Sequence, residues 1–449
     1  MEVYLVVGTG KSGVAASNLL KEKNEKFYLY DGNVSLNKEG FFEKNPSLKG
    51  VELFLGEVPE HVKEEVTCAV LSPGVPTDSE FVLDLRKHNI SLSGEVELAY
   101  TLGKGRVVAI TGTNGKTTTT ALTGLLMEQH FQDVRVVGNI GIPYTERVED
   151  ATDDSVFVAE ISSFQLETCD TFAPKVSAIL NITPDHLDRH HTMENYIAAK
   201  ESVTKNQTKD DVCVLNYEDE VLRQFGKSLN CKVVYFSSAS KLPDGVDGYY
   251  YNEGVIYKMP EEKIIAVEEL NILGLHNYEN AMAAIAMADA MGVEPEEIVR
   301  GLKAFHAVEH RIEYVCEKRG VRFYNDSKGT NPDAAIKGIE AMDRPTYLIG
   351  GGYDKNSTYD EWIDSFHGKV KKLVLIGQTK EKIAECAKAH GFMDYSFAES
   401  LKEAMDICYS EAKRGEAILL SPACASWGMF DNYEQRGDMF KEFARGYEE

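Results

Sequence analysis

The residues that point most directly to chemistry form one glycine-rich stretch, Gly112-Thr113-Asn114-Gly115-Lys116-Thr117. It follows the apolar run 107–110, which reads as a buried strand, and it opens a segment that reads as a helix. Such a loop and helix N-terminus present backbone N–H groups to an anion. Lys116 is placed to reach the β- and γ-phosphates of a nucleotide, and the Thr117 hydroxyl is placed to bind Mg²⁺. The full phosphate-loop pattern has glycine where Ile110 stands, so a plain strand–helix turn is the alternative.

A second glycine motif, Gly8-Thr9-Gly10-Lys11-Ser12-Gly13, lies near the N-terminus between a strand-like run and a helix-like run. Asp31 ends the next strand-like run, and this spacing is that of a dinucleotide-binding unit. Three interpretations stay open here: an NAD or FAD cofactor, a nucleotide-bearing substrate, or glycines needed only for helix–strand packing. A third strand-like run ends in Ser72-Pro73-Gly74, a tight turn where open α/β sheets bind ligands.

Candidate metal ligands follow two further strand-like runs. Glu160 ends the run 155–159, and an acidic residue there, beside a phosphate loop, is typical of Mg²⁺ binding; a solvated glutamate is the alternative. The segment 181–191 is dense in His and Asp and contains His186. It indicates either a metal site or a polar loop with helix caps. Lys200, in the helical segment that follows, cannot be told from a solvated lysine by its spacing.

Three asparagines have two interpretations each. Asn139 follows a short strand in the stretch 136–141, and it either binds substrate or forms the turn. Asn277 and Asn280 share one helical face because they are three residues apart. They either hydrogen-bond to the edge of an adenine base or cap the helix.

The C-terminal third repeats the pattern of a strand followed by a polar turn. Asp326, Lys328 and Thr330 crowd the end of the strand-like run 321–324, and Asn331 and Pro332 mark a helix start. Further polar turns follow at residues 350–355, 377 and 421–427, which indicates a second nucleotide-fold-like domain. Neither Ser426 nor Cys424 lies in the Gly-Xaa-Ser-Xaa-Gly elbow of a nucleophile, which disfavours both as catalytic nucleophiles.

The elements that must position these residues alternate as apolar strand, glycine-rich turn and helix, which predicts an α/β fold with mainly parallel sheets. A length of 449 residues is typical of two to three domains. We expect a Rossmann-like domain over residues 1–97, a P-loop ATPase-like domain over 98–305 and a second Rossmann-like domain over 306–449. A hinge is predicted near residues 303–311, beside His310-Arg311.

Composition excludes several classes of protein. The formal net charge of −24 argues against a nucleic-acid or anionic-membrane surface. No apolar run approaches the ~18–20 residues of a membrane span, and the N-terminus shows no signal-peptide pattern. Eight cysteines lie scattered without a Cys-Xaa-Xaa-Cys pair, which suits reduced thiols in a cytoplasmic protein. We expect a cytoplasmic monomer with no nucleic-acid partner and no membrane insertion.

Taken in order, these motifs resemble those of the Mur ligase family of bacterial cell-wall synthesis, over essentially the whole chain. The stretches that carry the resemblance are Gly112-Thr113-Asn114-Gly115-Lys116-Thr117, Glu160-Ile161-Ser162-Ser163-Phe164-Gln165-Leu166-Glu167, Asn181-Ile182-Thr183-Pro184-Asp185-His186-Leu187-Asp188-Arg189-His190, His276-Asn277-Tyr278-Glu279-Asn280, His310-Arg311 and Asn325-Asp326-Ser327-Lys328-Gly329-Thr330-Asn331. The Asp-Asn-Pro-Arg motif of the diaminopimelate- or lysine-adding members is absent.

The resemblance implies an ATP-dependent acid–amino-acid ligase of peptidoglycan precursor synthesis. The chain resembles most the members that add D-glutamate, because of its N-terminal unit, Ser72-Pro73-Gly74 and the stretches 325–331 and 421–426. The implied substrates are UDP-N-acetylmuramoyl-L-alanine and D-glutamate, joined through an acyl phosphate with release of ADP and phosphate. ATP and two Mg²⁺ ions are the implied cofactors, and cell shape and cell division are the implied processes.

The resemblance also implies a role for each motif residue. ATP would be held by Gly112, Thr113, Asn114, Gly115, Lys116, Thr117, Thr118, Asn277, Asn280, Arg311 and Asp326. The UDP-substrate would be held by Gly8, Gly10, Lys11, Ser12, Gly13, Asp31, Ser72, Pro73, Gly74, Asn139 and Ser162. D-Glutamate would be held by Lys328, Thr330, Lys355, Ser426 and Tyr433, the last at a position where Phe is common. The metal ligands would be Thr117, Glu160, His186 and Lys200, the lysine being carbamylated, and Lys116, Lys200 and His186 would be catalytic.

Three rival functions remain open at this point. The nearest is another amide ligase of the same family, such as the L-alanine-adding enzyme or folylpolyglutamate synthase. An NAD-dependent oxidoreductase would use the N-terminal glycine motif but leave Lys116, Thr117 and Glu160 unexplained. A nucleotide-sensing protein without catalysis is the third.

Overall fold

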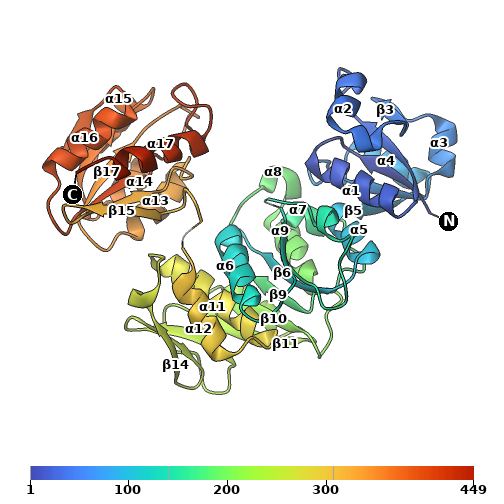
Figure 1. Ribbon diagram of the computed structural model, residues 1–449, viewed down its shortest axis with the longest axis horizontal. Coiled ribbons are helices and arrows are strands. Elements are labelled where there is room, and N and C mark those ends of the chain that lie inside the picture. The colour runs from blue at the N-terminus through green and yellow to red at the C-terminus, as the bar shows by residue number, and fades with distance from the viewer. Residues whose placement is uncertain (1, 140, 307, 449) are drawn as a thin grey trace. The chain divides into compact units, whose positions relative to one another are not determined.

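The computed structural model describes residues 2–139, 141–306 and 308–448. Ile140 of the predicted turn and Ala307 of the predicted hinge lie outside these ranges. The chain divides into two compact units: Met1–Ile265 with Glu279–Leu302, and Ala266–Tyr278 with Lys303–Glu449. Figure 1 labels helices and strands of both units. Three mostly parallel sheets, two in the first unit and one in the second, confirm the predicted α/β fold class. The predicted domain limits and the hinge stay predictions.

The first sheet is parallel throughout, in the order β3-β2-β1-β4-β5. Its strands are β1 (Val3–Val7), β2 (Lys26–Asp31), β3 (Leu53–Leu55), β4 (Cys68–Leu71) and β5 (Ser91–Gly94). Its helices are α1 (Lys11–Glu22), α2 (Lys38–Lys44), η1 (Pro46–Leu48), α3 (Glu60–Glu65), α4 (Glu80–Lys87) and α5 (Glu95–Leu102). Val7 pairs with Tyr30 and with Leu71, so the turns after β1, β2 and β4 meet at one edge.

The second sheet has the order β14-β13-β12-β11-β10-β9-β6-β8-β7. Its strands are β6 (Arg106–Thr111), β7 (Val134–Gly138), β8 (Val156–Glu160), β9 (Val176–Ile179), β10 (Val212–Asn216), β11 (Lys232–Ser237), β12 (Gly248–Asn252), β13 (Val255–Lys258) and β14 (Glu262–Ala266). Its helices are α6 (Lys116–Glu128), η2 (Tyr144–Arg147), α7 (Ser163–Leu166), α8 (Leu187–His190), α9 (Met193–Glu201), η3 (Ser202–Thr204), α10 (Glu220–Gly226), η4 (Val267–Glu269), α11 (Leu275–Ala290) and α12 (Pro295–Ala304). Strand β6 lies between β9 and β8 and is parallel to both, which brings their carboxyl ends together.

The third sheet has the order β15-β16-β20-β17-β18-β19, with only the β15–β16 pair antiparallel among its described pairs. Its strands are β15 (Glu313–Lys318), β16 (Val321–Asn325), β17 (Thr346–Gly350), β18 (Val370–Leu375), β19 (Tyr395–Phe397) and β20 (Ala417–Leu420). Its helices are α13 (Pro332–Glu340), α14 (Asp360–Asp364), α15 (Lys380–Ala389), α16 (Leu401–Glu411) and α17 (Tyr433–Arg445). Three polar turns, after β16, β20 and β17, therefore share one edge.

Several helices begin where the sequence supplies a capping side chain. The Asn331 side chain accepts a hydrogen bond from the backbone N–H of Ala334 at 2.8 Å, and Pro332 occupies the first position of α13, as predicted. Ser162 forms a capping box with Gln165 at the start of α7. Such caps place the turns before α7 and α13 at fixed positions relative to their strands.

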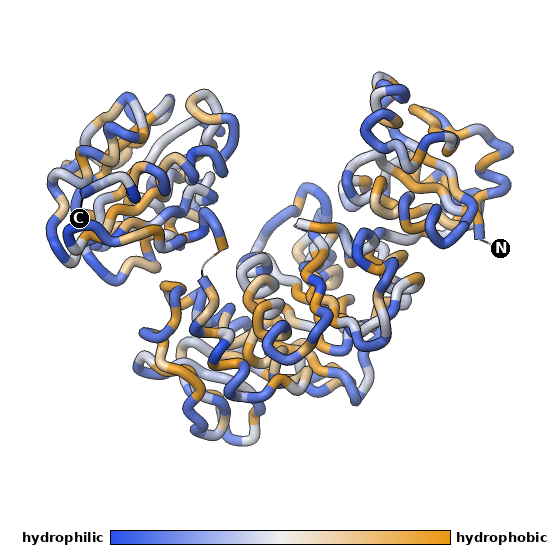
Figure 2. Tube along the Cα trace, viewed as in Figure 1, coloured by the Kyte–Doolittle hydropathy of each residue, from blue (hydrophilic) through white to orange (hydrophobic). Residues whose placement is uncertain are grey.

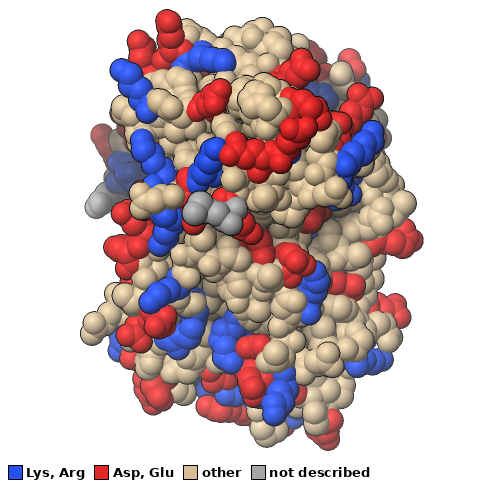
Figure 3. Space-filling model, turned by 90° about the vertical axis from the view of Figure 1, so that its right-hand side faces the viewer, with Lys and Arg blue, Asp and Glu red and all other residues tan. Residues whose placement is uncertain are grey.

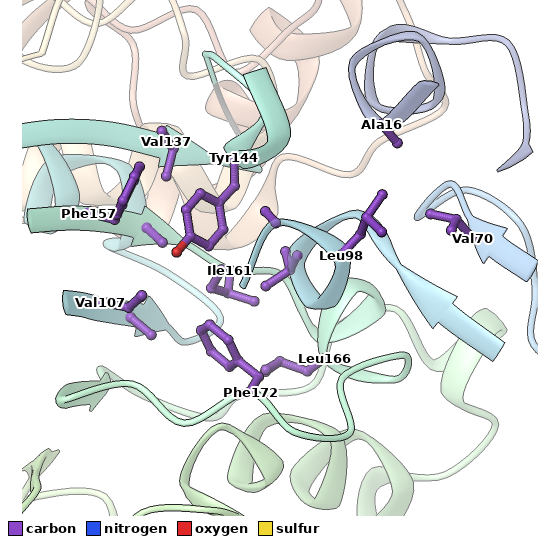
Figure 4. Packing of buried hydrophobic residues seen from close by; sticks show 14 of the residues in the cluster. Ala16, Val70, Leu98, Val107, Val137, Tyr144, Phe157, Ile161, Leu166 and Phe172 are labelled. Carbon is purple, nitrogen blue, oxygen red and sulfur yellow. The ribbon is translucent and has the colours of Figure 1, made fainter. Parts of the chain in front are cut away.

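One hydrophobic cluster runs through the first unit and joins its two sheets (Figure 4). Ala16 and Val70 belong to the first sheet layer, Val107 and Phe157 belong to the second, and Leu98 of α5 lies in the same cluster. Figure 2 shows apolar residues concentrated along the strands and the inner faces of helices. Burial of this apolar area is the main force holding the two layers as one unit.

The surface carries the negative charge that the composition requires. On the face drawn in Figure 3, Asp and Glu side chains are spread among Lys and Arg side chains. A net charge of −24 means that an anionic substrate must be held by local N–H groups and cations, because the overall field repels it. Among the described residues, no helix is both long and apolar enough to cross a membrane.

Candidate functional site

The phosphate loop after β6 has the backbone conformation that the glycines allow. Gly112 has φ +147° and Gly115 has φ +85°, both in the region that disfavours other residues. A Cβ on Gly115 would lie 2.3 Å from Oδ1 of Asn280. Asn280 also accepts a hydrogen bond from Thr119 at 3.1 Å, and Thr118 is buried beside it in the first turn of α6. The structure thus places Asn280 against the loop.

Asn181, two residues after the end of β9, positions the phosphate loop. This role was not assigned from the sequence. Its side chain accepts a hydrogen bond from the N–H of Asn114 at 2.8 Å and donates one to the Asn114 carbonyl at 3.1 Å. The backbone N–H of Thr113 donates to the Asn181 carbonyl at 2.9 Å. The sequence held two signals: Asn181 follows a strand-like run, and it opens one of the stretches that carry the family resemblance.

Two lysines converge on one carbonyl of the loop. Lys116 Nζ donates to the carbonyl oxygens of Gly112 and Thr113, each at 2.9 Å. Lys200, from α9, donates to the same Gly112 oxygen at 2.7 Å and is 2% exposed. Burial and the neighbouring Lys116 charge lower the pKa of Lys200 to about 7. Lys200 is therefore a buried amine beside the phosphate loop, with a large neutral fraction near neutral pH.

Glu160 lies at the end of β8, next to β6 in the sheet, and is 2% exposed. Its side chain accepts a hydrogen bond from Nδ2 of Asn139 at 3.0 Å, and its carbonyl accepts one from the Asn139 N–H at 2.8 Å. Within the described ranges, no Lys, Arg or His forms a salt bridge with it. A buried carboxylate with neutral partners fits a metal ligand, because a cation would compensate its charge.

The two candidate histidines after β9 have different environments. His186 is exposed, has a left-handed backbone at φ 51° and lies 4.9 Å from the ring centre of Phe164. His190 is buried, with Nε2 2.9 Å from Ser163 Oγ and Nδ1 3.2 Å from Glu167. Burial lowers the pKa of His190. The structure thus separates an accessible His186 from a structural His190, a distinction that the sequence left open.

Asn277 is placed differently from Asn280. Its side chain donates to the Leu273 carbonyl, four residues earlier in the chain, at 2.7 Å, which fixes the amide at the start of α11 but is not a helix cap. It belongs to the second compact unit, whereas Asn280 belongs to the first. Both residues lie in α11, three positions apart, as expected. Their joint role in adenine binding stays a prediction.

The N-terminal glycine motif is packed so closely that side chains at Gly8 and Gly13 would clash. A Cβ on Gly13 would lie 1.9 Å from the Gly8 carbonyl oxygen, and one on Gly8 would lie 2.5 Å from Ser72 Oγ. Asp31 accepts a hydrogen bond from the Thr9 N–H at 3.0 Å; burial opposes its ionisation, but hydrogen bonds from Thr9 and Asn33 lower its pKa. Ser72 Oγ is buried and has no hydrogen-bond partner among the described residues.

The remaining predicted UDP-substrate residues surround this motif. Gly10 and Gly74 are exposed, Ser12 and Pro73 are half-buried, and Ser162 caps α7. The Lys11 ammonium donates to the Gly141 carbonyl, near Asn139, so the first and second sheets of this unit meet here. Gly8, Asp31 and Ser72 thus share one sheet edge, and Lys11 links it to the turn after β7.

Two of the cavities formed by described residues lie in the first unit. One of about 590 Å³ opens beside Thr9, Gly10 and Lys11, but Glu22, Glu146 and Glu149 also line it. Lys44 lines it as well, so three carboxylates and two lysines surround this cavity. The other, of about 310 Å³, is lined by Tyr249, Lys258, Glu262, Lys263, Ile264, Ile285, Asp289, Pro295, Glu296, Ile298 and Val299, and none of these is a predicted site residue.

In the second unit, Asp326 lies at the end of β16, next to β20. It is buried, and its carboxylate accepts a hydrogen bond from Ser421 Oγ at 2.7 Å. Burial raises the pKa of Asp326 to about 7, although Ser421 and the charge of the exposed Arg311 oppose this. Cys424 is also buried and its pKa is raised by burial, which agrees with the expectation that it is not a nucleophile.

Lys328 and Tyr433 are brought together, with Lys328 Nζ 5.6 Å from the ring centre. Lys355 Nζ lies 4.8 Å from the ring centre of Trp427, which is exposed and adjoins the buried Ser426. Thr330 is half-buried in the same turn as Lys328. Two cation–aromatic pairs therefore lie on the turns after β16, β17 and β20. Trp427 was not among the predicted site residues.

Arg436 of α17, which the sequence did not single out, holds two of these turns together. It is fully buried and donates to Ser327 Oγ at 2.9 Å, to the Ser327 carbonyl at 2.8 Å and to the Cys424 carbonyl at 3.2 Å. Burial lowers its pKa to about 10. Arg436 thereby fixes the turn of Lys328 relative to the turn of Ser426.

The raised pKa of Asp326 predicts a pH-dependent stability of the second unit. A folded carboxyl that keeps its proton up to about pH 7, while the unfolded one loses it near pH 4, makes the unit lose stability as pH rises between those values. Asp326→Asn removes this loss. We expect the difference in free energy of unfolding between the variant and wild type to grow, in favour of the variant, by on the order of 2 kcal/mol from about pH 5 to about pH 8.

Urea unfolding followed by tryptophan fluorescence measures this effect, because both tryptophans, Trp362 and Trp427, belong to the second unit. Asp394→Asn, at an exposed carboxyl, is the control and should show no such gain. An equal difference between Asp326→Asn and wild type at both pH values would contradict the prediction.

Comparison with protein families matches two regions of the chain. Residues 110–288 match the Mur ligase middle domain, and residues 310–424 match the Mur ligase, glutamate ligase domain. The first region contains the phosphate loop, Glu160, His186 and Lys200, and the second contains Asp326 and Lys328.

Individual relatives extend the similarity over nearly the whole chain. UDP-N-acetylmuramoylalanine–D-glutamate ligase of Lachnoclostridium phytofermentans is 53% identical over 441 residues, which cover 98% of this chain and 97% of the relative. Among solved structures, UDP-N-acetylmuramate-alanine ligase from Thermotoga maritima gives a TM-score of 0.61 at 19% identity, covering 99% of each chain. A MurF ligase from Thermotoga maritima, in complex with ADP, gives a TM-score of 0.59 at 16% identity and covers 99% of this chain and 95% of that one. At these identities the two structures show a shared fold.

Proposed function

We propose, from the premise that this chain belongs to the Mur ligase family, that it joins D-glutamate to UDP-N-acetylmuramoyl-L-alanine in an ATP-dependent reaction of peptidoglycan precursor synthesis. The name of the 53% identical relative supports the choice of substrates. The observation in the structure that carries the proposal is the convergence of Lys116 and Lys200 on the Gly112 carbonyl of the phosphate loop.

The chemistry explains why a phosphate loop is needed. A carboxylate is a poor acyl donor, because its leaving group would be oxide. Transfer of the γ-phosphoryl group to the substrate carboxylate gives an acyl phosphate and ADP. The neutral amine of D-glutamate then attacks the carbonyl carbon, and phosphate leaves with one of the original carboxylate oxygens. Lys116 offsets the repulsion between the two anions that must meet in the first step.

Divalent magnesium fits the residues around the loop. The buried Glu160 carboxylate, whose hydrogen-bond donor is a neutral amide, the Thr117 hydroxyl and the exposed His186 would hold it. Bound Mg²⁺ supplies charge neutralisation and polarises the transferring phosphoryl group. Lys200 would join this set after its neutral amine reacts with CO₂, which forms an N–C bond, releases one proton and leaves a carbamate anion. The buried position and lowered pKa of Lys200 support this.

We place D-glutamate at the sheet edge of the second unit. Its two carboxylates call for two cations, and Lys328 and Lys355 lie there against Tyr433 and Trp427. Thr330 and Ser426 supply hydroxyl groups on the same turns. Arg311 and Asp326, also in this unit, are proposed for the phosphates and ribose of ATP.

The UDP part of the other substrate is placed at the edge of the first sheet. Gly10 and Gly74 are open there, and the Ser72 hydroxyl can donate to a phosphate oxygen. Asp31, Lys11 and Asn139 complete this proposed edge. The protein is further proposed to act as a cytoplasmic monomer with the three domains 1–97, 98–305 and 306–449.

A phosphate-release assay across amino acids tests the function. With ATP, Mg²⁺ and UDP-N-acetylmuramoyl-L-alanine, we expect release to depend on D-glutamate and to be absent with L-glutamate, L-alanine or L-lysine. Turnover with L-alanine or L-lysine alone would assign the chain to another ligase of the family. Hydride transfer with NADH, or nucleotide binding without phosphate release for any acceptor, would overturn the ligase assignment itself.

A further inference from the structure

A group of metal-ligand side chains lies on two adjacent helices of the second unit, and the proposed reaction uses none of them. Asp360 and Asp364 lie four residues apart on α14; Cys386 lies in the last turn of α15, and His390, four residues on, directly follows the end of that helix. Residues four apart on a helix share one face. Ligand atoms of Asp360, Cys386 and His390 all lie within 4.8 Å of one another.

We propose that Asp360, Cys386 and His390 bind a borderline-soft divalent cation of the Zn²⁺ class, with Asp364 orienting the histidine. A thiolate, an imidazole and a carboxylate are together a ligand set for Zn²⁺, whereas Mg²⁺ prefers oxygen ligands alone. Three protein ligands at the surface leave a fourth position for water.

The distances fit this arrangement with small rotamer changes. His390 Nε2 lies 3.0 Å from Asp360 Oδ1. Two ligands of a tetrahedral Zn²⁺ site, each bonded at about 2.0–2.1 Å, are about 3.3 Å apart, so a cation can enter between them. His390 Nδ1 lies 2.7 Å from Asp364 Oδ1. An imidazole that ligates through one nitrogen and donates from the other to a carboxylate is the usual arrangement around zinc.

An ion pair is the simpler alternative. A protonated His390 between Asp360 and Asp364 would satisfy both nitrogens without any metal. That alternative gives Cys386 no role, whereas the metal site requires its sulfur. Cys386 is therefore the residue that separates the two.

The test is a Co²⁺ titration of the full-length protein, with absorption read in the thiolate-to-cobalt charge-transfer region. A cysteine ligand is needed for this band, and the proposed ATP site has none among its residues. We expect one band per chain, lost when Zn²⁺ displaces the cobalt and absent in Cys386→Ser. Asp364→Asn should weaken binding by about 10–100-fold, because it replaces the carboxylate that orients His390. Cys316→Ser, at a half-buried cysteine of β15, is the matched control and should bind like wild type.

Folding of each variant is checked with Trp362, which is buried in α14 between the two aspartates. Zn²⁺ should raise the urea midpoint of wild type and of Cys316→Ser, but not of Cys386→Ser or His390→Ala. A charge-transfer band that persists in folded Cys386→Ser, or the absence of any band in wild type, would overturn the metal site. The ion pair of His390 would then be the whole account of the cluster.

Discussion

Lys116→Ala is expected to slow phosphate transfer by about 10³-fold while leaving the UDP-substrate bound. Phosphate oxygens are proposed to bind at this loop. Lys116 Nζ already lies on it, 2.9 Å from the carbonyl oxygens of Gly112 and Thr113. Without it, two anions must approach with one fewer compensating charge. Removal of one transition-state donor reduces kcat by about 10²–10³-fold, and we expect a loss at the upper end because the donor is charged.

The measurement pairs single-turnover ADP formation with calorimetric binding of UDP-N-acetylmuramoyl-L-alanine. Lys104→Ala, at an exposed lysine just before β6, is the control and should keep both. Equal loss of turnover and of UDP-substrate binding in Lys116→Ala would mean that the first unit had lost its structure, and the proposed role would not stand.

Lys200→Ala is expected to lose most activity and to recover part of it with small carboxylates. The wild-type side chain is 2% exposed, donates to Gly112 and has a pKa of about 7. A neutral amine reacts with CO₂, so the carbamate should form readily near neutral pH and less at lower pH, where the amine is protonated. Formate or acetate can occupy the space that truncation opens and replace the lost carboxylate.

Activity in CO₂-depleted buffer, with and without added bicarbonate, measures the same claim on the wild type. We expect bicarbonate to restore activity, and ¹³C-labelled bicarbonate to give a carbamate resonance that Lys200→Ala lacks. Lys205→Ala, at an exposed lysine paired with Asp170 close after α9, is the control and should behave like wild type. Full activity of Lys200→Ala without any carboxylate would remove Lys200 from the site.

Residues that are close in sequence could be assigned from the sequence, because their geometry is local. The loop 112–117 lies between an apolar strand and a helix, and Asn331 with Pro332 starts α13 as expected. Glu160 could also be found, because parallel strands bring their carboxyl ends to one edge and β8 lies beside β6. The α/β class with mainly parallel sheets followed from the same alternation.

Residues whose role depends on distant partners could not be assigned in this way. Lys200 is 88 residues from the Gly112 carbonyl that it binds, and Arg436 is 109 residues from Ser327. Burial of a lysine or an arginine runs against its usual preference, so composition gives no warning of it. Asn181 and Trp427 likewise gain their significance from the loop and the lysine beside them.

The most direct test of the account follows oxygen from the substrate carboxylate. UDP-N-acetylmuramoyl-L-alanine labelled with ¹⁸O in its alanine carboxylate is turned over with ATP and D-glutamate, and the released phosphate is analysed by mass spectrometry. An acyl phosphate intermediate predicts one ¹⁸O atom in each phosphate formed, because phosphate leaves with a carboxylate oxygen. Phosphate without the label would show that ATP is hydrolysed by water and would contradict the ligase chemistry proposed for Lys116 and its loop.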